Sequence, residues 1–180
     1  MATFRRSTAK GATWFFTVVT YRRQPVLAQP HALQALRAAV RSVRQSHPFE
    51  IVAWVVLPDH MHAIWRLPDG DAAYPTRWAL IKRDTAQASR HLISAPVTES
   101  ARKRGEIGFW QRRYWEHQLR DEVDLSRHVD YIHYNPVKHG LTTRVVDWPH
   151  STFHRYVQRG LLAHDWAVDE VAADDMRFGE

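Results

Sequence analysis

The stretch FEIVAWVVLPDHMHAIWRL, residues 49–67, decides the fold of this chain. Two runs rich in β-branched and aromatic residues, 49–57 and 60–67, lie on either side of the pair Pro58-Asp59. Apolar runs separated by such a turn-forming pair are typical of a β-hairpin. We therefore expect two antiparallel strands near the middle of the sequence.

Helical and strand patterns alternate around this hairpin. Residues 13–23 are rich in β-branched and aromatic residues and predict a buried strand. Residues 30–46 predict a helix, because apolar side chains recur at intervals of three and four. The elements expected after the hairpin are a helix over 76–92, an exposed loop over 94–108, a strand over 114–120, a helix over 126–135 closed by Pro136, and an amphipathic helix over 148–160.

The order of these elements, β-α-β-β-α-β-α with a further helix, predicts an α+β fold. Interleaved helices and a central hairpin favour a ferredoxin-like antiparallel sheet with helices packed on it. We expect a single domain over residues 1–160, followed by an acidic C-terminal tail over residues 161–180.

Composition limits the chemistry that is available. The 180 residues include no cysteine, which excludes disulfides and thiolate zinc sites, so any metal must use imidazole, carboxylate or amide ligands. The N-terminus lacks the apolar core of a signal peptide, and no apolar run reaches the roughly 18 residues that a membrane span needs. We expect a cytoplasmic protein without a membrane partner.

The charge is unevenly distributed along the chain. The net charge is +6, but residues 161–180 hold six acids against one arginine, so the rest of the chain carries +11. A basic body favours a polyanionic partner, most commonly nucleic acid, although a solvated basic surface is the alternative. The acidic tail could cover that surface, and deleting residues 167–180 is then expected to raise DNA affinity or cleavage.

Two histidines share one face of the second hairpin strand. Side chains alternate along a strand, so His60 and His62 project together while Met61 and Ala63 point the other way. Two parallel imidazoles can share a divalent cation. The alternative is a pair of ordinary hydrogen-bonded histidines.

The helix expected over residues 126–135 places two polar side chains one turn apart. Tyr131 and Asn135 are four residues apart and therefore lie on one helical face, which presents a nucleophile beside an oxygen ligand. The alternative is a core tyrosine and an asparagine that ends the helix before a proline.

Four blocks together resemble a known family. WVVLPDHMHAIW, FWQRRYWEH, HVDYIHYNPVKHG and DWPHSTFHR occur in the order found in the REP-associated tyrosine transposases, relatives of the single-tyrosine transposases of the HUH endonuclease superfamily. KGATWFFTVVTYRR is similar to the opening strand of that family, so the resemblance covers roughly residues 4–166.

The resemblance implies a role for each matching residue. His60 and His62 stand at the paired histidines of the family motif and would bind a divalent metal, Mg²⁺ or Mn²⁺. Tyr131 stands at the nucleophile, and Asn135 at the third metal ligand, which is often glutamine. Asp59 matches an acidic position. The implied partners are REP elements, short imperfect palindromes that form single-stranded DNA hairpins with a conserved tetranucleotide at the foot.

The implied reaction is a transesterification. A free tyrosine phenol has a pKa near 10 and needs a nearby cation or base to act as a nucleophile at neutral pH. Attack by Tyr131 would leave a 5′-phosphotyrosine and a free 3′-hydroxyl. A DNA 3′-hydroxyl could later displace the tyrosine, so strand transfer needs no nucleotide cofactor.

Basic residues are expected to hold the DNA, with a solvated basic face as the alternative for each. Those expected at the hairpin foot are Arg5, Arg6 and Lys10, and those expected along the phosphates are Arg37, Arg41, Arg44, Arg112, Arg113 and Lys138. FWQRRYW, residues 109–115, has a composition suited to stacking unpaired bases, although Phe109 and Trp110 fit a core equally well.

Other functions remain open from the sequence. The first is a hairpin-binding protein that has lost cleavage. The second is a zinc hydrolase, but the sequence offers no obvious third zinc ligand. The third is a basic domain without catalytic activity, which would make the co-occurrence of the four sequence blocks a coincidence. We expect a monomer, because Tyr131 follows the 114–120 strand closely enough to complete the site of its own chain; a dimer that shares active sites between chains, as in related transposases, is the alternative.

Overall fold

The computed structural model describes residues 9–93 and 96–167, so Arg5, Arg6 and most of the predicted acidic tail lie outside the described residues. Its main elements are, in chain order, β1 (Thr13–Val19), α1 (Pro30–Ser46), β2 (Glu50–Val56), β3 (His60–Arg66), α2 (Tyr74–Ala88), α3 (Glu99–Lys103), β4 (Trp115–Gln118), α4 (Glu122–Lys138) and α5 (Phe153–Gln158). In the described ranges, no helix is both long and apolar enough to cross a membrane.

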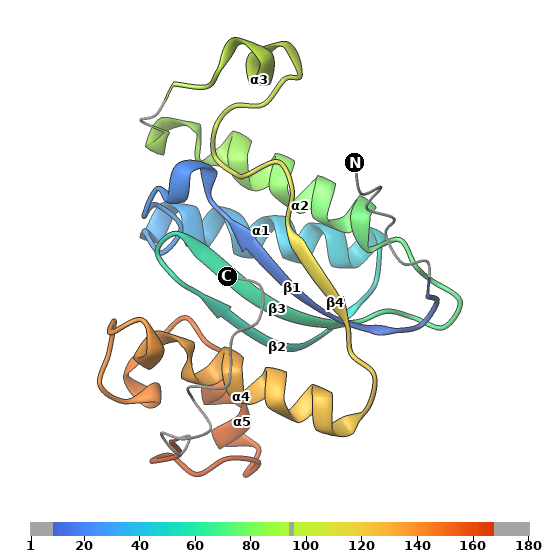
Figure 1. Cartoon of the computed structure of the whole chain (residues 1–180), viewed down its shortest axis with the longest axis vertical. Coiled ribbons are helices and arrows are strands. Elements are labelled where there is room, and N and C mark those ends of the chain that lie inside the picture. The colour runs from blue at the N-terminus through green and yellow to red at the C-terminus, as the bar shows by residue number, and fades with distance from the viewer. Residues whose placement is uncertain (1–8, 94–95, 168–180) are drawn as a thin grey trace, which may run out of the picture.

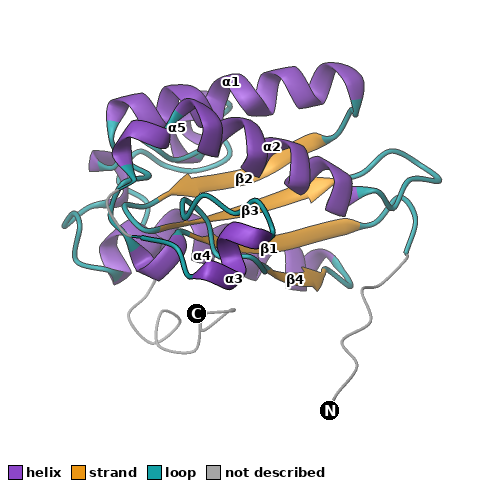
Figure 2. Cartoon of the chain, turned by 90° about the horizontal axis from the view of Figure 1, so that it is seen from above, coloured by secondary structure: helices purple, strands orange, loops and turns teal. Residues whose placement is uncertain are grey.

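The four strands form one antiparallel sheet in the order β2-β3-β1-β4 (Figures 1 and 2). Strand β1 pairs with both β3 and β4, and the expected hairpin joins β2 to β3. This order is that of the split β-α-β arrangement, so the predicted ferredoxin-like α+β fold is confirmed.

Helices cover the two faces of the sheet separately (Figure 1). Met61, Ala63 and Trp65 belong to the core under α1 and α2, where the indoles of Trp65 and Trp78 stack with centroids 4.1 Å apart. Ile64 belongs to the second core, which α4 closes with Val129 and Ile132. Alternation along β3 therefore sends the even-numbered residues 60, 62 and 64 to the α4 face.

Helix α4 is longer than the sequence pattern indicates. It begins at Glu122, where the Asp121 carboxylate caps it by accepting a hydrogen bond from the Asp124 N–H at 2.8 Å. The expectation that Pro136 closes the helix is wrong, because α4 continues to Lys138. Pro136 has no N–H for the Ile132 carbonyl and its ring crowds that carbonyl, but the helical bonding resumes beyond it, because the His139 N–H reaches the Asn135 carbonyl at 3.0 Å.

The predicted helix over 148–160 is also wrong in its first part. Only Phe153–Gln158 is helical, whereas the preceding residues run along the open edge of β2. There Val56 donates to the His150 carbonyl at 2.9 Å and Thr152 donates to the Trp54 carbonyl at 2.8 Å. An edge strand has unpaired backbone N–H and C=O groups that can bond to another segment of the chain. The periodicity of residues 148–152 does not indicate that this segment supplies the bonds.

Two smaller differences concern the segment between β3 and β4. Helix α2 begins at Tyr74 and ends at Ala88, so it is shifted towards the N-terminus relative to the predicted range. The predicted loop contains the short helix α3, which Thr98 caps by accepting from the Ala101 N–H.

Candidate active site

His60 and His62 lie side by side on the α4 face of the sheet, as predicted. Their side chains are 3% and 0% exposed, and their ring centroids are 5.0 Å apart. Nδ1 of His60 donates to Asp59 Oδ1 at 2.6 Å, and Nδ1 of His62 is hydrogen-bonded to the Thr17 hydroxyl at 2.9 Å. Thr17 is the register partner of His62 on β1, so the sheet itself positions this contact.

The two Nε2 atoms are buried and have no hydrogen-bond partner. Burial lowers the pKa of His60, and the Asp59 carboxylate opposes this effect. Burial, with smaller contributions from the His60 and His139 imidazoles and from Lys138, lowers the pKa of His62 well below its ordinary value. Both imidazoles are therefore neutral at pH 7. Since the Asp59 carboxylate can only accept, the proton of His60 is on Nδ1 and a lone pair is on Nε2.

Asp59 is itself held by a second partner. Arg23 Nη1 donates to Asp59 Oδ2 at 3.0 Å, and Arg23 has a left-handed backbone with φ of 52°. Burial alone would raise the pKa of Asp59, but the hydrogen bonds from His60 and Arg23 hold it below the ordinary value. The acidic residue before the paired histidines thus acts as an anchor for the ring of His60.

Helix α4 brings Tyr131 to the histidines. Tyr131 is 1% exposed, and its ring lies 5.0 Å from that of His62 at an interplanar angle of 65°. The Lys138 Nζ lies 4.8 Å from the centre of the same tyrosine ring. The nucleophile candidate therefore has a cation and a neutral imidazole as immediate neighbours.

Asn135 follows Tyr131 by one helical turn and is fully buried. Its Oδ1 and Nδ2 have no hydrogen-bond partner. Leaving a buried polar atom unpaired costs roughly 1–3 kcal/mol, so such atoms call for a specific reason. Two imidazole nitrogens and one amide oxygen left unpaired are a donor set that suits a divalent cation.

Comparison with known proteins identifies the chain. The model of the family "Transposase IS200 like" matches residues 10–135. The chain is 47% identical over 170 residues to the REP-associated tyrosine transposase of Escherichia coli strain K12, covering 94% of this chain and 93% of that protein. The chain belongs to the REP-associated tyrosine transposases.

A solved structure of this family superimposes closely on the transposase. It is described as a REP-associated tyrosine transposase bound to a REP hairpin, and it matches with a TM-score of 0.83 and 46% identity. The match covers 100% of this chain and 98% of the other. The sheet and its helices are therefore those of a REP-associated transposase.

The basic residues expected to bind DNA are spread over several regions of the transposase. Lys138 lies at Tyr131, Arg112 and Arg113 are exposed just before β4, and Lys10 is exposed ahead of β1. Arg37, Arg41 and Arg44 are exposed on α1, which packs on the opposite face of the sheet from the histidines. Of the aromatic residues nearby, Phe109 and Trp110 belong to the core, whereas Trp115 is 38% exposed.

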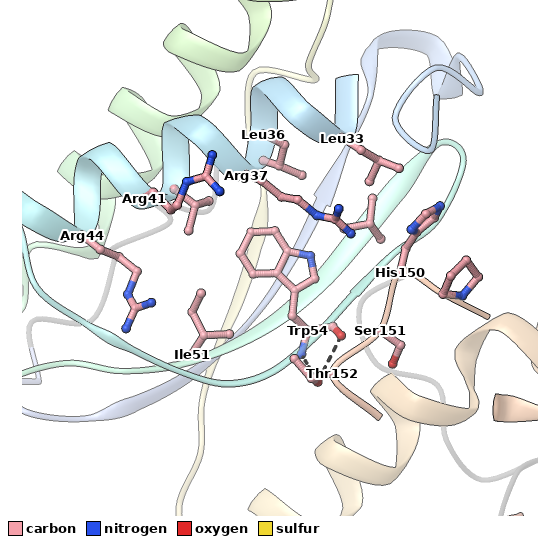
Figure 3. A pocket seen from close by; sticks show the side chains of 13 residues that line it. Leu33, Leu36, Arg37, Arg41, Arg44, Ile51, Trp54, His150, Ser151 and Thr152 are labelled. Atoms are coloured by element: carbon pink, nitrogen blue, oxygen red, sulfur yellow. Dashed lines mark hydrogen bonds between the residues drawn. The ribbon is translucent and has the colours of Figure 1, made fainter. Parts of the chain in front are cut away.

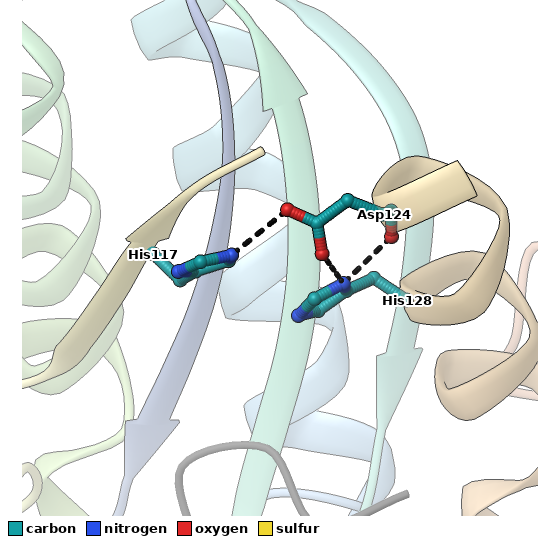
Figure 4. A group of neighbouring side chains, drawn as sticks. All are labelled: His117, Asp124 and His128. Atoms are coloured by element: carbon teal, nitrogen blue, oxygen red, sulfur yellow. Dashed lines mark hydrogen bonds and ion pairs between the residues drawn. The ribbon is translucent and has the colours of Figure 1, made fainter. Parts of the chain in front are cut away.

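A second cluster of ligand-type residues lies between β4 and α4 (Figure 4). His117, Asp124 and His128 each offer one ligand atom, all within 4.8 Å of one another, which is compatible with a metal site. Hydrogen bonds already use these atoms, since Asp124 accepts from His117 Nε2 at 3.0 Å and from the Arg120 N–H at 3.1 Å. His128 Nδ1 lies 2.7 Å from the Asp124 carbonyl, which can only accept, so this nitrogen carries a proton.

Two neighbours of the transposase site went unassigned from the sequence. The His139 ring lies 5.1 Å from that of His60, and Arg23 holds Asp59. His139 follows Tyr131 and Asn135 at intervals of four, so helical spacing could have found it. Arg23 carried no such signal, because its contact depends on the turn after β1.

Proposed function

We propose that this transposase cleaves single-stranded DNA with Tyr131 as the nucleophile and rejoins it by strand transfer. The observation that supports this most strongly is the pair of neutral imidazoles with buried, unpaired Nε2 atoms, beside which α4 holds the tyrosine ring at 5.0 Å from His62. The buried His133 also leaves one ring nitrogen without a partner, so what distinguishes this pair is its geometry: two imidazoles with centroids 5.0 Å apart lie on one face of the sheet, beside a tyrosine.

His60, His62 and Asn135 would hold a divalent cation, Mg²⁺ or Mn²⁺. Their donors fit the group, because each is buried, uncharged and free of other partners. Asp59 and Thr17 orient the two rings from behind, as second-layer groups do in metal sites. The bound cation supplies charge that polarises a phosphate and stabilises negative charge on its oxygens.

The chain's own residues carry out the covalent step. The Tyr131 hydroxyl gives up its proton to water and its oxygen attacks the scissile phosphorus, while the bond from phosphorus to the 3′-oxygen breaks. The products are a 5′-phosphotyrosine and a 3′-hydroxyl, whose oxygen takes a proton back from water, so that no net proton is lost. The Lys138 ammonium, 4.8 Å from the ring centre, places a positive charge beside the reacting group, where it would stabilise negative charge on the phosphate oxygens. In strand transfer a DNA 3′-hydroxyl attacks the same phosphorus and releases Tyr131.

The substrate that we propose is a hairpin of REP type. The related protein of 46% identity is described as bound to a REP hairpin, and the body of this chain is strongly basic. Lys10, Arg112, Arg113 and Lys138 would contact phosphates of the bound DNA, as would Arg5 and Arg6, which lie outside the described residues.

The experiment is a cleavage assay on labelled DNA. A REP-type hairpin with single-stranded flanks is incubated with Mn²⁺ or Mg²⁺ and separated on a denaturing gel. We expect a covalent protein–DNA product with the wild type and none with Tyr131→Phe or with chelator. Tyr134→Phe is the matched control, since it removes a hydroxyl from the same helix without touching the histidines.

Two results would contradict the proposal. A covalent product from Tyr131→Phe would exclude this nucleophile. Tight hairpin binding without a covalent product, in either metal, would identify a hairpin-binding protein that no longer cuts.

A further inference from the structure

An open groove of about 320 Å³ runs between α1 and the edge strand β2, away from the histidines (Figure 3). Leu33, Leu36 and Val40 of α1 form its upper wall, and residues 149–152 form the lower one. The indole of Trp54 lies between these walls. The catalytic proposal makes no use of this groove.

The groove is positively charged. Arg37, Arg41 and Arg44 line it from successive turns of α1, and no acidic side chain is among the residues that form it. Arg37 and Arg41 make no ion pair within residues 9–93 and 96–167, while Arg44 donates to the Phe49 carbonyl at 3.0 Å. A row of cations at helical spacing, without acidic neighbours, suits a polyanion.

The main chain at Trp54 is held by residue 152, which also lines the groove. The backbone N–H of Trp54 donates to the Thr152 hydroxyl at 2.8 Å, and the Trp54 carbonyl accepts from the Thr152 N–H at 2.8 Å. The side chain packs against the edge of the α1 core and is only half-buried. A partly exposed indole beside arginines is the combination with which proteins stack unpaired bases and track their phosphates.

We propose that this groove binds unpaired nucleotides of the DNA that flanks the hairpin. One base stacks on Trp54, while Arg37 and Arg41 contact the phosphates on either side. An acidic peptide would pair with the arginines but would have no base to stack on the indole. The presence of Trp54 in the groove therefore favours single-stranded DNA as the ligand. The inference rests on the proposed function only in taking DNA as the substrate.

The groove lies directly across the sheet from the cleavage site. Trp54 pairs in register with Ala63, and the neighbouring Val55 pairs with His62. Alternation along β2 directs Val55 to the α4 face and Trp54 to the α1 face. A strand held at Trp54 must therefore pass around the β2 edge, so the groove acts on long flanks and not on the hairpin itself.

The test measures binding of labelled oligothymidylate by fluorescence anisotropy, using lengths from about 4 to about 16 nucleotides. We expect Trp54→Ala to weaken binding about tenfold and Trp54→Phe to retain most of it, because phenylalanine still stacks. We expect Arg37→Gln with Arg41→Gln to weaken binding and to lower the slope of log affinity against log salt by about 1.4.

The matched control replaces Arg90 and Arg159 by glutamine, which removes the same charge from exposed positions outside the groove. Thermal melting of each variant identifies losses that come from misfolding. The proposal is overturned if the groove variants bind like the wild type, or if the control loses as much affinity as they do.

Cleavage of a hairpin with minimal flanks separates this inference from the proposed function. We expect Trp54→Ala to cut that substrate at the wild-type rate when it is saturating. Slower cutting by this variant, if it melts normally, would place the groove in the cleavage site and overturn the inference. A wild type that cuts nothing but loses oligothymidylate binding on Trp54→Ala would support the groove and refute the nuclease.

Discussion

The contact between Asp59 and His60 is the most consequential single interaction near the candidate metal site. The carboxylate fixes both the orientation of the ring and the position of its proton, and so leaves the Nε2 lone pair directed away from Asp59. Arg23 holds the other carboxylate oxygen. Arg23 and Asp59 together thus orient His60 so that its Nε2 is available as a metal ligand.

Replacing Asp59 by asparagine tests this arrangement. The amide can still accept a hydrogen bond, but it lacks the charge that strengthens the bond to His60, so we expect Mn²⁺ affinity to fall roughly 10- to 100-fold. Isothermal titration calorimetry of the DNA-free protein measures the affinity directly.

Asp69→Asn is the control, because Asp69 also follows a proline in a turn and is exposed. Unchanged Mn²⁺ affinity in Asp59→Asn would remove Asp59 from the site.

Helix α4 is the element on which both the site and part of the fold depend. One side of it presents Tyr131 to His62, and His133 packs against α5, 4.8 Å from the Tyr156 ring. His133 is also hydrogen-bonded through Nε2 to the Thr152 hydroxyl at 3.2 Å. The helix therefore links the active-site face to the segment that covers the β2 edge.

Burial, with smaller contributions from Arg155 and His154, lowers the pKa of His133 to about 3. In the unfolded chain, His133 takes up a proton as the pH falls through about 6.5, whereas in the folded chain it does so only near pH 3. The contribution of His133 to the free energy of unfolding is therefore fully present above pH 6.5 and is lost as the solution is acidified towards pH 3. At pH 5 the expected loss from this one group is about 2 kcal/mol.

Denaturant unfolding at pH 7 and pH 5 measures this loss. We expect His133→Gln to lose about 2 kcal/mol less between the two pH values than the wild type does. The exposed His164→Gln is expected to behave like the wild type. Equal losses in His133→Gln and the wild type would show that His133 is protonated in the folded chain.

At the scale of the whole molecule, one chain brings the candidate nucleophile and the candidate metal ligands together. Tyr131 lies against His62 of the same protein, so we propose that a monomer forms a complete site. Exchange of α4 between two chains is the alternative.

Mixing two inactive variants distinguishes these cases. With Tyr131 and His62 in one chain, a mixture of Tyr131→Phe and His62→Ala is expected to stay as inactive as either variant alone. A site shared between chains would restore cleavage to roughly a quarter to a half of the wild-type level. The mixture is incubated at high concentration before the gel assay, and size-exclusion chromatography with light scattering measures the mass.

The sequence by itself determined the elements whose signals are local. Helix α1 spans the predicted residues, the hairpin turns at Pro58-Asp59, and His60 and His62 share a face, because these features follow from spacings of two to four residues. The extent of α4 beyond Pro136 was not determined in this way, since a proline beyond the first turn predicts a helix end or kink, whereas α4 continues to Lys138.

Only the tertiary structure decided what the distant segments do. Periodicity shows that a helix has an apolar side, but not which face of the sheet it covers. The docking of α4 on the face of β3 that carries His62 and the addition of residues 148–152 to the β2 edge join residues about 70 to 100 positions apart. The groove around Trp54 joins α1 to residues 149–152, which follow α1 by more than 100 positions. Such contacts depend on the packing of the whole core, which no local pattern specifies.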